Sequence, residues 1–270
     1  MENERIIESP QNPRVKTAVK LRKSRFRREI KKTLVEGFRE IARAVQAGWK
    51  FDELYYAPAL FLDAEANRLL EQIAQTNTPI FQCSEAAFRK MSYRDTPDGL
   101  LALSPLAGKP LAKIQLPENP LLLIAERLEK PGNLGTLLRT ADAAGVDAVI
   151  VCDPRTDINN PNVIRASMGT LFFMPIAEAS SEETMQWLKE KKIQPVSAFP
   201  AAQKEYTQLN LKTPTAIIVG AEDEGLTNVW ATETDQARIP MLGQNDSLNV
   251  STAAAIFLYE AVRQRRGVPS

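Results

Sequence analysis

Histidine is absent from this chain of 270 residues. Its absence removes the commonest general base, the usual partner of a catalytic serine and the commonest zinc ligand. Only two cysteines, Cys83 and Cys152, are present, and their separation fits neither a redox pair nor a metal-ligand spacing. We therefore expect two reduced thiols, no metal site, and chemistry that other side chains carry out.

Long hydrophobic runs are also missing. The apolar stretches at 121–125 and 253–258 are far shorter than the roughly 20 residues that span a membrane. Residues 1–5 are polar and lack the apolar core of a secretory signal. These features predict a cytoplasmic protein without a transmembrane segment.

Positive charge is concentrated near the N-terminus, although the formal net charge of the whole chain is only +1. Between residues 14 and 32 only Glu29 is acidic. Such a strip neutralises phosphates and attracts nucleic acid without reading its sequence. A solvated helix face would give the same pattern, so both interpretations stay open. The basic residues are Arg14, Lys16, Lys20, Arg22, Lys23, Arg25, Arg27, Arg28, Lys31 and Lys32.

The first half of the chain alternates between helical and strand-like patterns. Residues 13–48 have apolar positions at helical spacing, interrupted by a short strand at 33–37. Further elements are expected as strands at 51–57, 79–82 and 100–103, and as helices at 64–75 and from Ser84 onward. This pattern predicts a small α/β domain over residues 1–106. Glycine and prolines between 107 and 120 predict a linker.

Residues 121–270 alternate more regularly. Strands are predicted at 121–126, 148–152, 172–177, 193–198, 216–220 and 236–239. Helices are predicted at 135–144, 163–167, 182–191 and 250–265. This order is typical of an α/β fold with a mostly parallel sheet and helices on both faces.

Three loops of unusual composition follow strands of this second domain, at the sheet edge where open α/β folds bind ligands. Each pattern alone has a structural explanation, such as a helix cap and a surface arginine in the first loop. The loops occupy residues 131–141, 217–226 and 239–251. Their polar candidates are Asn133 and Arg139 in the first, Glu222 in the second, and Ser247 and Asn249 in the third.

Together and in this order, the three loops resemble the signature motifs of the SpoU (TrmH-like) RNA 2′-O-ribose methyltransferase family of the SPOUT superfamily. Residues 9–16, 35–37 and 96–100 resemble the substrate-binding domain that precedes many SpoU catalytic domains. The resemblance therefore covers nearly the whole chain. Two positions depart from the pattern: Lys130 stands where an acidic residue is common, and Asp223 where glycine is common. Neither departure removes a catalytic candidate.

The resemblance implies a SPOUT-type catalytic domain over residues 121–270, with a C-terminal trefoil knot. It implies that the first domain resembles ribosomal proteins that bind kinked RNA. It also implies a homodimer, and RNA contacts by Arg165 and Ser167, for which a helix-ending arginine is an alternative explanation. The implied cofactor is S-adenosylmethionine, bound by Gly220, Ile239 and Leu248, with Val219, Met241 and Ala198 lining its pocket.

The implied reaction moves a methyl group from a sulfonium to a ribose hydroxyl, which must be aligned and deprotonated. The resemblance implies that Arg139 activates the hydroxyl. Guanidinium groups are normally never deprotonated, so Arg139 alternatively holds a phosphate and orients the hydroxyl. Glu222 is expected to orient Asn133 or Arg139, with a structural cap as its alternative. The predicted catalytic set is Arg139, Asn133, Glu222, Ser247 and Asn249.

We predict ribosomal RNA as the substrate, because a domain of the type that binds kinked RNA suits a structured ribosomal target. Three alternatives stay open: a tRNA ribose methyltransferase, a base methyltransferase of the wider SPOUT group, and a non-catalytic RNA-binding or ribosome-assembly factor that retains the fold. A dinucleotide-dependent dehydrogenase is disfavoured, because no strand is followed by a Gly-x-Gly-x-x-Gly loop.

Overall fold

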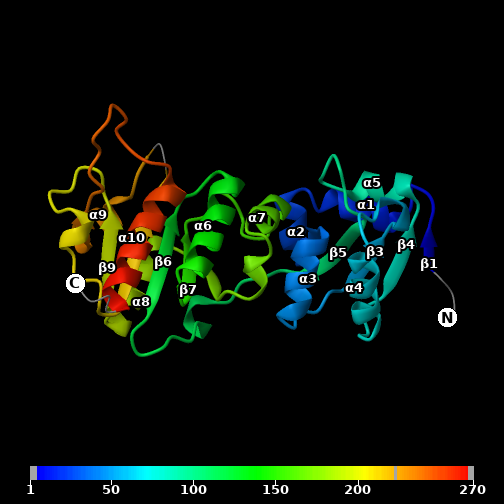
Figure 1. Cartoon of the computed structure of the whole chain (residues 1–270), viewed down its shortest axis with the longest axis horizontal. Coiled ribbons are helices and arrows are strands. Elements are labelled where there is room, and N and C mark those ends of the chain that lie inside the picture. Colours follow the sequence, from blue (N-terminus) through cyan, green and yellow to red (C-terminus); the bar gives the residue numbers. More distant parts are fainter. Residues whose placement is uncertain (1–4, 222–223, 267–270) are drawn as a thin grey trace. The chain divides into compact units, whose positions relative to one another are not determined.

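The structure is a computed structural model that describes residues 5–221 and 224–266. Glu222, one of the predicted catalytic residues, lies outside the described residues. The chain divides into two compact units (Figure 1). The first unit contains Met1–Ala107 and Asp157–Phe173, and the second contains Gly108–Thr156 and Met174–Ser270.

A mixed five-stranded sheet forms the centre of the first unit. Its strand order is β1 (Arg5–Ile7), β4 (Ile80–Cys83), β3 (Glu53–Tyr56), β5 (Leu100–Pro105) and β2 (Lys32–Glu36). Strand β4 pairs in parallel with both of its neighbours, whereas β5 pairs antiparallel with β3 and β2. The longer helices of this unit are α1 (Pro13–Lys20), α2 (Ser24–Ile30), α3 (Phe38–Gln46), α4 (Glu65–Ala74) and α5 (Glu85–Met91).

The basic N-terminal segment forms two helices rather than one. Helix α1 begins at Pro13, and the Asn12 side chain accepts a hydrogen bond from the backbone N–H of Arg14. Both features favour a helix start. Val15 and Ala18 are buried in the core of the unit, and the basic residues Arg14, Lys16 and Lys20 project outward from the other side of the helix.

Residues 157–173 pack into the first unit, although the sequence places them within the second predicted domain. This segment contains α7 (Pro161–Ala166) and a 3₁₀ turn at Thr170–Phe172. The Thr33 hydroxyl donates to the carbonyl of Asn159 at 2.6 Å. The Phe172 ring lies 5.2 Å from that of Trp49. The segment is therefore fixed by hydrogen bonds and aromatic packing inside the first unit.

The second unit is built on a six-stranded sheet in which every neighbouring pair is parallel. Strands β6, β7 and β10 are buried along their whole length, as expected where helices cover both faces. The predicted parallel α/β sheet is thus confirmed. The strand order is β11 (Asp235–Ala237), β9 (Gln194–Ala198), β10 (Thr215–Val219), β6 (Leu121–Glu126), β7 (Ala148–Cys152) and β8 (Ile176–Ala179).

Helices of the second unit are α6 (Pro131–Ala143), α8 (Ser181–Lys191), α9 (Asn228–Glu233) and α10 (Val250–Arg265). Helices α6 and α10 lie side by side (Figure 1). The predicted linker is not detached from this unit, because Leu111 and Ile114 are buried in its core. Within residues 5–221 and 224–266, every helix is too short or too polar to cross a bilayer.

One predicted strand is partly wrong. The sequence predicts a strand at 172–177, but Phe172 ends the 3₁₀ turn and strand β8 starts only at Ile176. Phe172 and Met174 are buried by packing rather than by strand pairing, whereas Phe173 is exposed. The short elements β1 and α9 were not predicted, because three and six residues are too few to show a period.

Candidate active site

The three predicted motif loops emerge at one edge of the second sheet. Strands β6 and β10 are parallel neighbours and end together, with Ala125 paired to Val219. Strand β11 joins the same sheet through β9, where Ala237 pairs with Ala198. Because parallel strands all end at the same edge, the loops after them face one region, as in other open α/β sheets.

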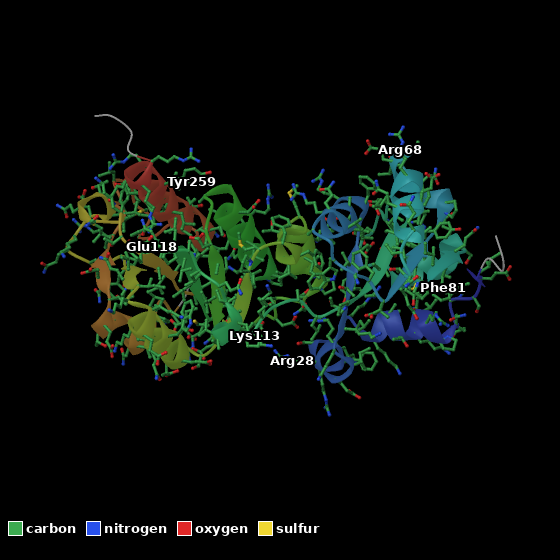
Figure 2. All side chains as sticks on the ribbon, turned by 90° about the horizontal axis from the view of Figure 1, so that it is seen from below. Arg28, Arg68, Phe81, Lys113, Glu118 and Tyr259 are labelled. Carbon is green, nitrogen blue, oxygen red and sulfur yellow. The ribbon has the colours of Figure 1, made fainter. Side chains whose placement is uncertain are left out.

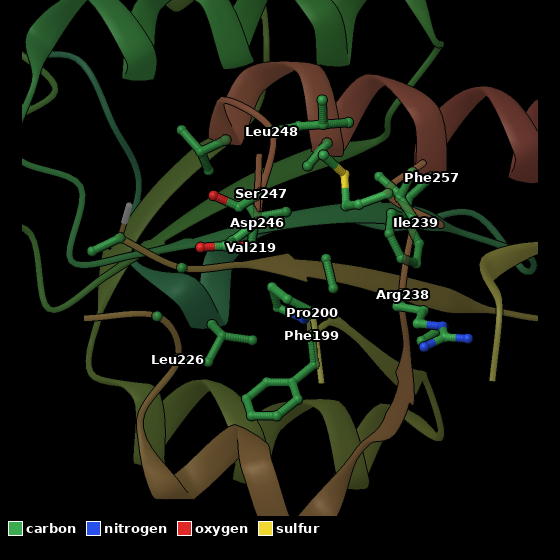
Figure 3. A pocket seen from close by; sticks show the side chains of 18 residues that line it. Phe199, Pro200, Val219, Leu226, Arg238, Ile239, Asp246, Ser247, Leu248 and Phe257 are labelled. Carbon is green, nitrogen blue, oxygen red and sulfur yellow. The ribbon is translucent and has the colours of Figure 1, made fainter. Parts of the chain in front are cut away.

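A pocket at this edge collects the residues predicted to bind the cofactor. All six of them line it: Ala198, Val219, Gly220, Ile239, Met241 and Leu248. Figure 3 shows Val219, Ile239 and Leu248 around the pocket, together with Leu226 and Phe257. Ser247, from the predicted catalytic set, also lines it. The sequence therefore identified a group of residues that the fold brings to a single pocket.

Position 220 requires glycine, because the backbone of residues 225 and 226 lies very close to it. A Cβ at this position would lie 2.6 Å from the carbonyl oxygen of Gly225 and 2.9 Å from the backbone nitrogen of Leu226. The N–H of Gly225 donates to the carbonyl of Ala221 at 3.0 Å, which closes the turn. Gly225 itself has φ +67°, a conformation that glycine adopts without strain. The second motif thus folds back onto the end of β10.

Asn133 and Asn249 meet, although 116 positions separate them. The side-chain nitrogen of Asn249 donates to the Asn133 side-chain oxygen at 3.3 Å. Asn249 also caps α10 by accepting from the N–H of Ser251 at 3.0 Å. The Ser251 hydroxyl donates to the carbonyl of Asn133 at 3.1 Å. The first turn of α6 and the start of α10 are therefore joined.

Arg139 does not join this pair. It lies six residues after Asn133 on α6, which places it about 240° around the helix axis. Its side chain is exposed, and in the described part of the chain its guanidinium has no hydrogen-bond or ion-pair partner. The structure thus brings together Asn133, Asn249 and the pocket lined by Ser247, and leaves Arg139 on the surface.

An ion-pair network beside Asn133 was not predicted from the sequence. Arg155 donates to Glu224 at 2.7 Å and also pairs with Glu129, while Arg127 lies 3.3 Å from Glu224. The Arg155 hydrogen bond lowers the pKa of the Glu224 carboxyl. Arg155 and Glu224 line a small cavity together with Asn133. The sequence feature that could have revealed this network is the presence of charged residues directly after buried strands.

Most of the predicted RNA-binding residues lie on the surface of the first unit. Arg22 donates to the carbonyl of Ser92 at 2.5 Å, and its guanidinium lies 5.2 Å from the centre of the Tyr93 ring. Arg28, labelled in Figure 2, is exposed on α2. The exposed members of the predicted set are Arg14, Lys16, Lys20, Arg22, Lys23, Arg25, Arg28 and Arg165.

Two residues of that set are corrected by the structure. Arg27 is only 3% exposed, pairs with Asp157, and donates to the carbonyl of Leu21 at 2.8 Å. Ser167 is fully buried, and its hydroxyl donates to the carbonyl of Ile164 at 2.9 Å. Both side chains are therefore buried in the first unit rather than part of its exposed surface. Composition alone does not show which side of a short helix packs inward.

Both cysteines are free and buried. Burial raises the pKa of each thiol to about 12, so neither forms a thiolate nucleophile at neutral pH. In the described ranges no cluster of acidic or cysteine side chains is arranged to hold a metal ion.

Family models match both halves of the chain. The SpoU rRNA Methylase family model matches residues 120–259, and the MRM3-like substrate binding domain model matches residues 12–102. The chain is 32% identical over 244 residues to a 23S rRNA (uridine(2479)-2′-O)-methyltransferase of Streptomyces viridochromogenes, covering 86% of this chain and 83% of that protein. It is 29% identical to RlmP of Bacillus subtilis, a 23S rRNA (guanosine(2553)-2′-O)-methyltransferase, covering 94% and 97%.

Solved structures of similar proteins span nearly the same length. An RNA 2′-O ribose methyltransferase is 40% identical with a TM-score of 0.83, covering 97% of this chain and 99% of that one. An AdoMet-bound rRNA methyltransferase of Sinorhizobium meliloti is 30% identical with a TM-score of 0.88, covering 98% and 99%.

Proposed function

The chain belongs to the SpoU rRNA methylase family, and on that premise we propose that it methylates the 2′-hydroxyl of a ribose in ribosomal RNA, with S-adenosylmethionine as cofactor. The observation that carries the proposal is the single pocket lined by all six predicted cofactor residues. Relatives that match along most of both chains are 23S rRNA 2′-O-methyltransferases. The pocket and the family thus point to the same reaction.

The lining of the pocket fits S-adenosylmethionine. Leu226, Ile239 and Leu248 provide apolar walls for a purine ring. The exposed carboxylate of Asp246 also lines the pocket and favours a ligand with positive charge. When bound, the cofactor supplies an electrophilic methyl group on a sulfonium. We propose that backbone groups of Gly220, Ile239 and Leu248 hold it.

The target ribose is positioned, in this proposal, by the first and third motifs. Asn249 fixes the Asn133 side chain through the 3.3 Å hydrogen bond, so the Asn133 amide is oriented before RNA binds. Ser247 lies in the wall of the cofactor pocket, where its hydroxyl orients the acceptor. Glu222 completes the set and lies outside the described residues.

Arg139 is assigned to a site shared between two copies of the chain. Its exposed side chain lies about 240° around α6 from Asn133, so it is directed away from the pair in its own subunit. We propose a homodimer in which Arg139 serves the partner's site. There its guanidinium binds an RNA phosphate and orients the 2′-hydroxyl, whose proton passes to solvent water as the methyl group is transferred. A knotted C-terminal segment belongs to the same proposal.

The exposed basic residues of α1 and α2 provide the RNA-binding surface in this proposal. Their positive charge neutralises phosphates without reading sequence. Arg22 is held by its hydrogen bonds and by Tyr93, which preorganises it for a phosphate. A cytoplasmic location, where ribosomal RNA is found, is part of the proposal.

The first test maps 2′-O-methylation across ribosomal and transfer RNA in cells with and without the protein, by sequencing that detects resistance of methylated sites to cleavage. We expect one ribosomal site to be lost without the protein and restored by the wild type. Arg139→Ala should not restore it. Arg68→Ala, the same substitution at an exposed position on α4, is the matched control and should restore it.

The other outcomes separate the alternatives. Loss of a transfer RNA site would identify a tRNA methyltransferase. Restoration by Arg139→Ala would contradict the role of Arg139. If every site persisted without the protein while ribosome assembly was impaired, the assembly-factor interpretation would replace the proposed activity.

A further inference from the structure

A buried carboxylate at the end of β6 has no part in the proposed chemistry. Glu126 is 0% exposed, and a charged carboxylate removed from water is costly unless hydrogen bonds satisfy it. Thr227 supplies two such bonds: its N–H donates to Oε2 at 2.8 Å, and its hydroxyl donates to Oε1 at 2.6 Å. The Ser181 hydroxyl lies 2.8 Å from Oε1. Glu126 is thus held mainly by one loop residue.

Thr227 directly follows the part of the second motif loop that forms the pocket wall. Gly225 and Leu226 line the pocket, and Gly225 packs against Gly220 at the end of β10. Glu126 lies behind this wall and is not one of the lining residues. The loop is therefore attached at three points: the turn on Gly220, the ion pairs of Glu224 with Arg127 and Arg155, and the bonds between Thr227 and Glu126.

Ser181 does not replace this attachment. Its hydroxyl lies 2.6 Å from Oδ2 of Asp153, and its N–H donates to the same oxygen at 3.1 Å. A hydroxyl has a single hydrogen and donates to one carboxylate at a time. Whether it donates to Glu126 or to Asp153, Thr227 keeps both of its bonds. Among these contacts, only the Thr227 bonds connect Glu126 to the pocket loop.

We infer that Glu126 is a positioning residue for the methyltransferase site: through Thr227 it holds the loop that forms one wall of the S-adenosylmethionine pocket. The inference rests on the proposed function. Hydrogen bonds to a charged acceptor are strong, and they fix the loop before the cofactor binds. Without them the binding-competent loop is less populated, and the apparent affinity falls by that fraction.

The test measures the dissociation constant of S-adenosylmethionine by calorimetry for the full-length wild type, Glu126→Gln, Thr227→Val and the double variant. Loss of a charge-assisted bond should raise the constant about tenfold in each single variant. The double variant should not multiply the two effects, because both substitutions weaken the same link between residues 126 and 227. In turnover assays, KM for the cofactor should rise while KM for RNA stays constant.

Ser181→Ala is the matched control, because it removes a partner of Glu126 without touching the loop. It should leave the dissociation constant unchanged even if it lowers the melting temperature. If Glu126→Gln does not fold, Thr227→Val tests the same link alone. Two outcomes would overturn this inference but leave the proposed function standing. One is an unchanged dissociation constant for S-adenosylmethionine in a folded Glu126→Gln or Thr227→Val variant, and the other is an equal rise of that constant in Ser181→Ala. A wild type that does not bind S-adenosylmethionine would overturn the proposed function with it.

Discussion

Replacement of Arg27 by methionine should destabilise the first unit and leave its RNA-binding surface intact. The side chains of Arg27 and Asp157 are only 3% and 7% exposed. Removing the guanidinium leaves Asp157 buried with the Ser24 hydroxyl, 2.6 Å from its Oδ2, as its remaining side-chain donor among the described residues. Breaking a buried ion pair from one side costs about 3–5 kcal/mol.

The structure places the expected cost near the lower end of that range. Nε of Arg27 and Oδ1 of Asp157 have no hydrogen-bond partner among the described residues, so the native pair is itself incompletely satisfied. We therefore expect a loss of about 3 kcal/mol in the free energy of unfolding. The double variant Arg27→Met/Asp157→Leu should recover most of this loss, because no uncompensated charge stays buried.

Arg28→Met is the matched control, because Arg28 is exposed on the same helix. Urea unfolding followed by circular dichroism gives stability, and RNA titrations at several salt concentrations give the electrostatic contribution. Arg28→Met should change stability by less than about 0.5 kcal/mol and should reduce the salt dependence of RNA binding. Arg27→Met should lower the free energy of unfolding and leave the salt dependence of RNA binding unchanged. A stable Arg27→Met protein with weakened RNA binding would refute the buried role of Arg27.

Three further predictions concern individual residues. Gly220→Ala should weaken S-adenosylmethionine binding by at least about tenfold in calorimetry, because its Cβ would lie 2.6 Å from the carbonyl oxygen of Gly225. Burial raises the pKa of Glu40, and Arg94 opposes this shift. Arg94→Met should raise that pKa further, so melting curves should show the largest destabilisation at neutral pH and less as Glu40 takes up a proton on acidification. Arg265 donates to four backbone carbonyls, so Arg265→Lys should lower the free energy of unfolding by about 2 kcal/mol in urea titrations; an unchanged midpoint would contradict this.

Helices and strands with a clear hydrophobic pattern could be predicted from the sequence. Strand β6 and helix α10 have the predicted bounds, 121–126 and 250–265. Strand β6 is a short continuous apolar run, as in a fully buried strand, and α10 is a long alanine-rich segment that favours a helix. The prediction of a strand at 172–177 was partly wrong, because the structure of this segment depends on distant contacts. Its apolar residues pack against partners more than a hundred positions earlier, such as Trp49, and no local period reports such a contact.

The sequence by itself determined the parallel α/β sheet and the three motif loops at its edge, since a parallel sheet brings loops after its strands to one edge. The resemblance to the SpoU family named the pocket residues within and beside those loops. Only the tertiary structure decided which polar side chains meet. It joined Asn133 to Asn249, and Glu126 to Thr227, across more than a hundred positions each. It also buried Arg27 among neighbours that composition treats as one basic surface. The physical reason is that local periodicity sets the helices and strands, whereas burial and hydrogen-bond partners depend on packing between distant segments.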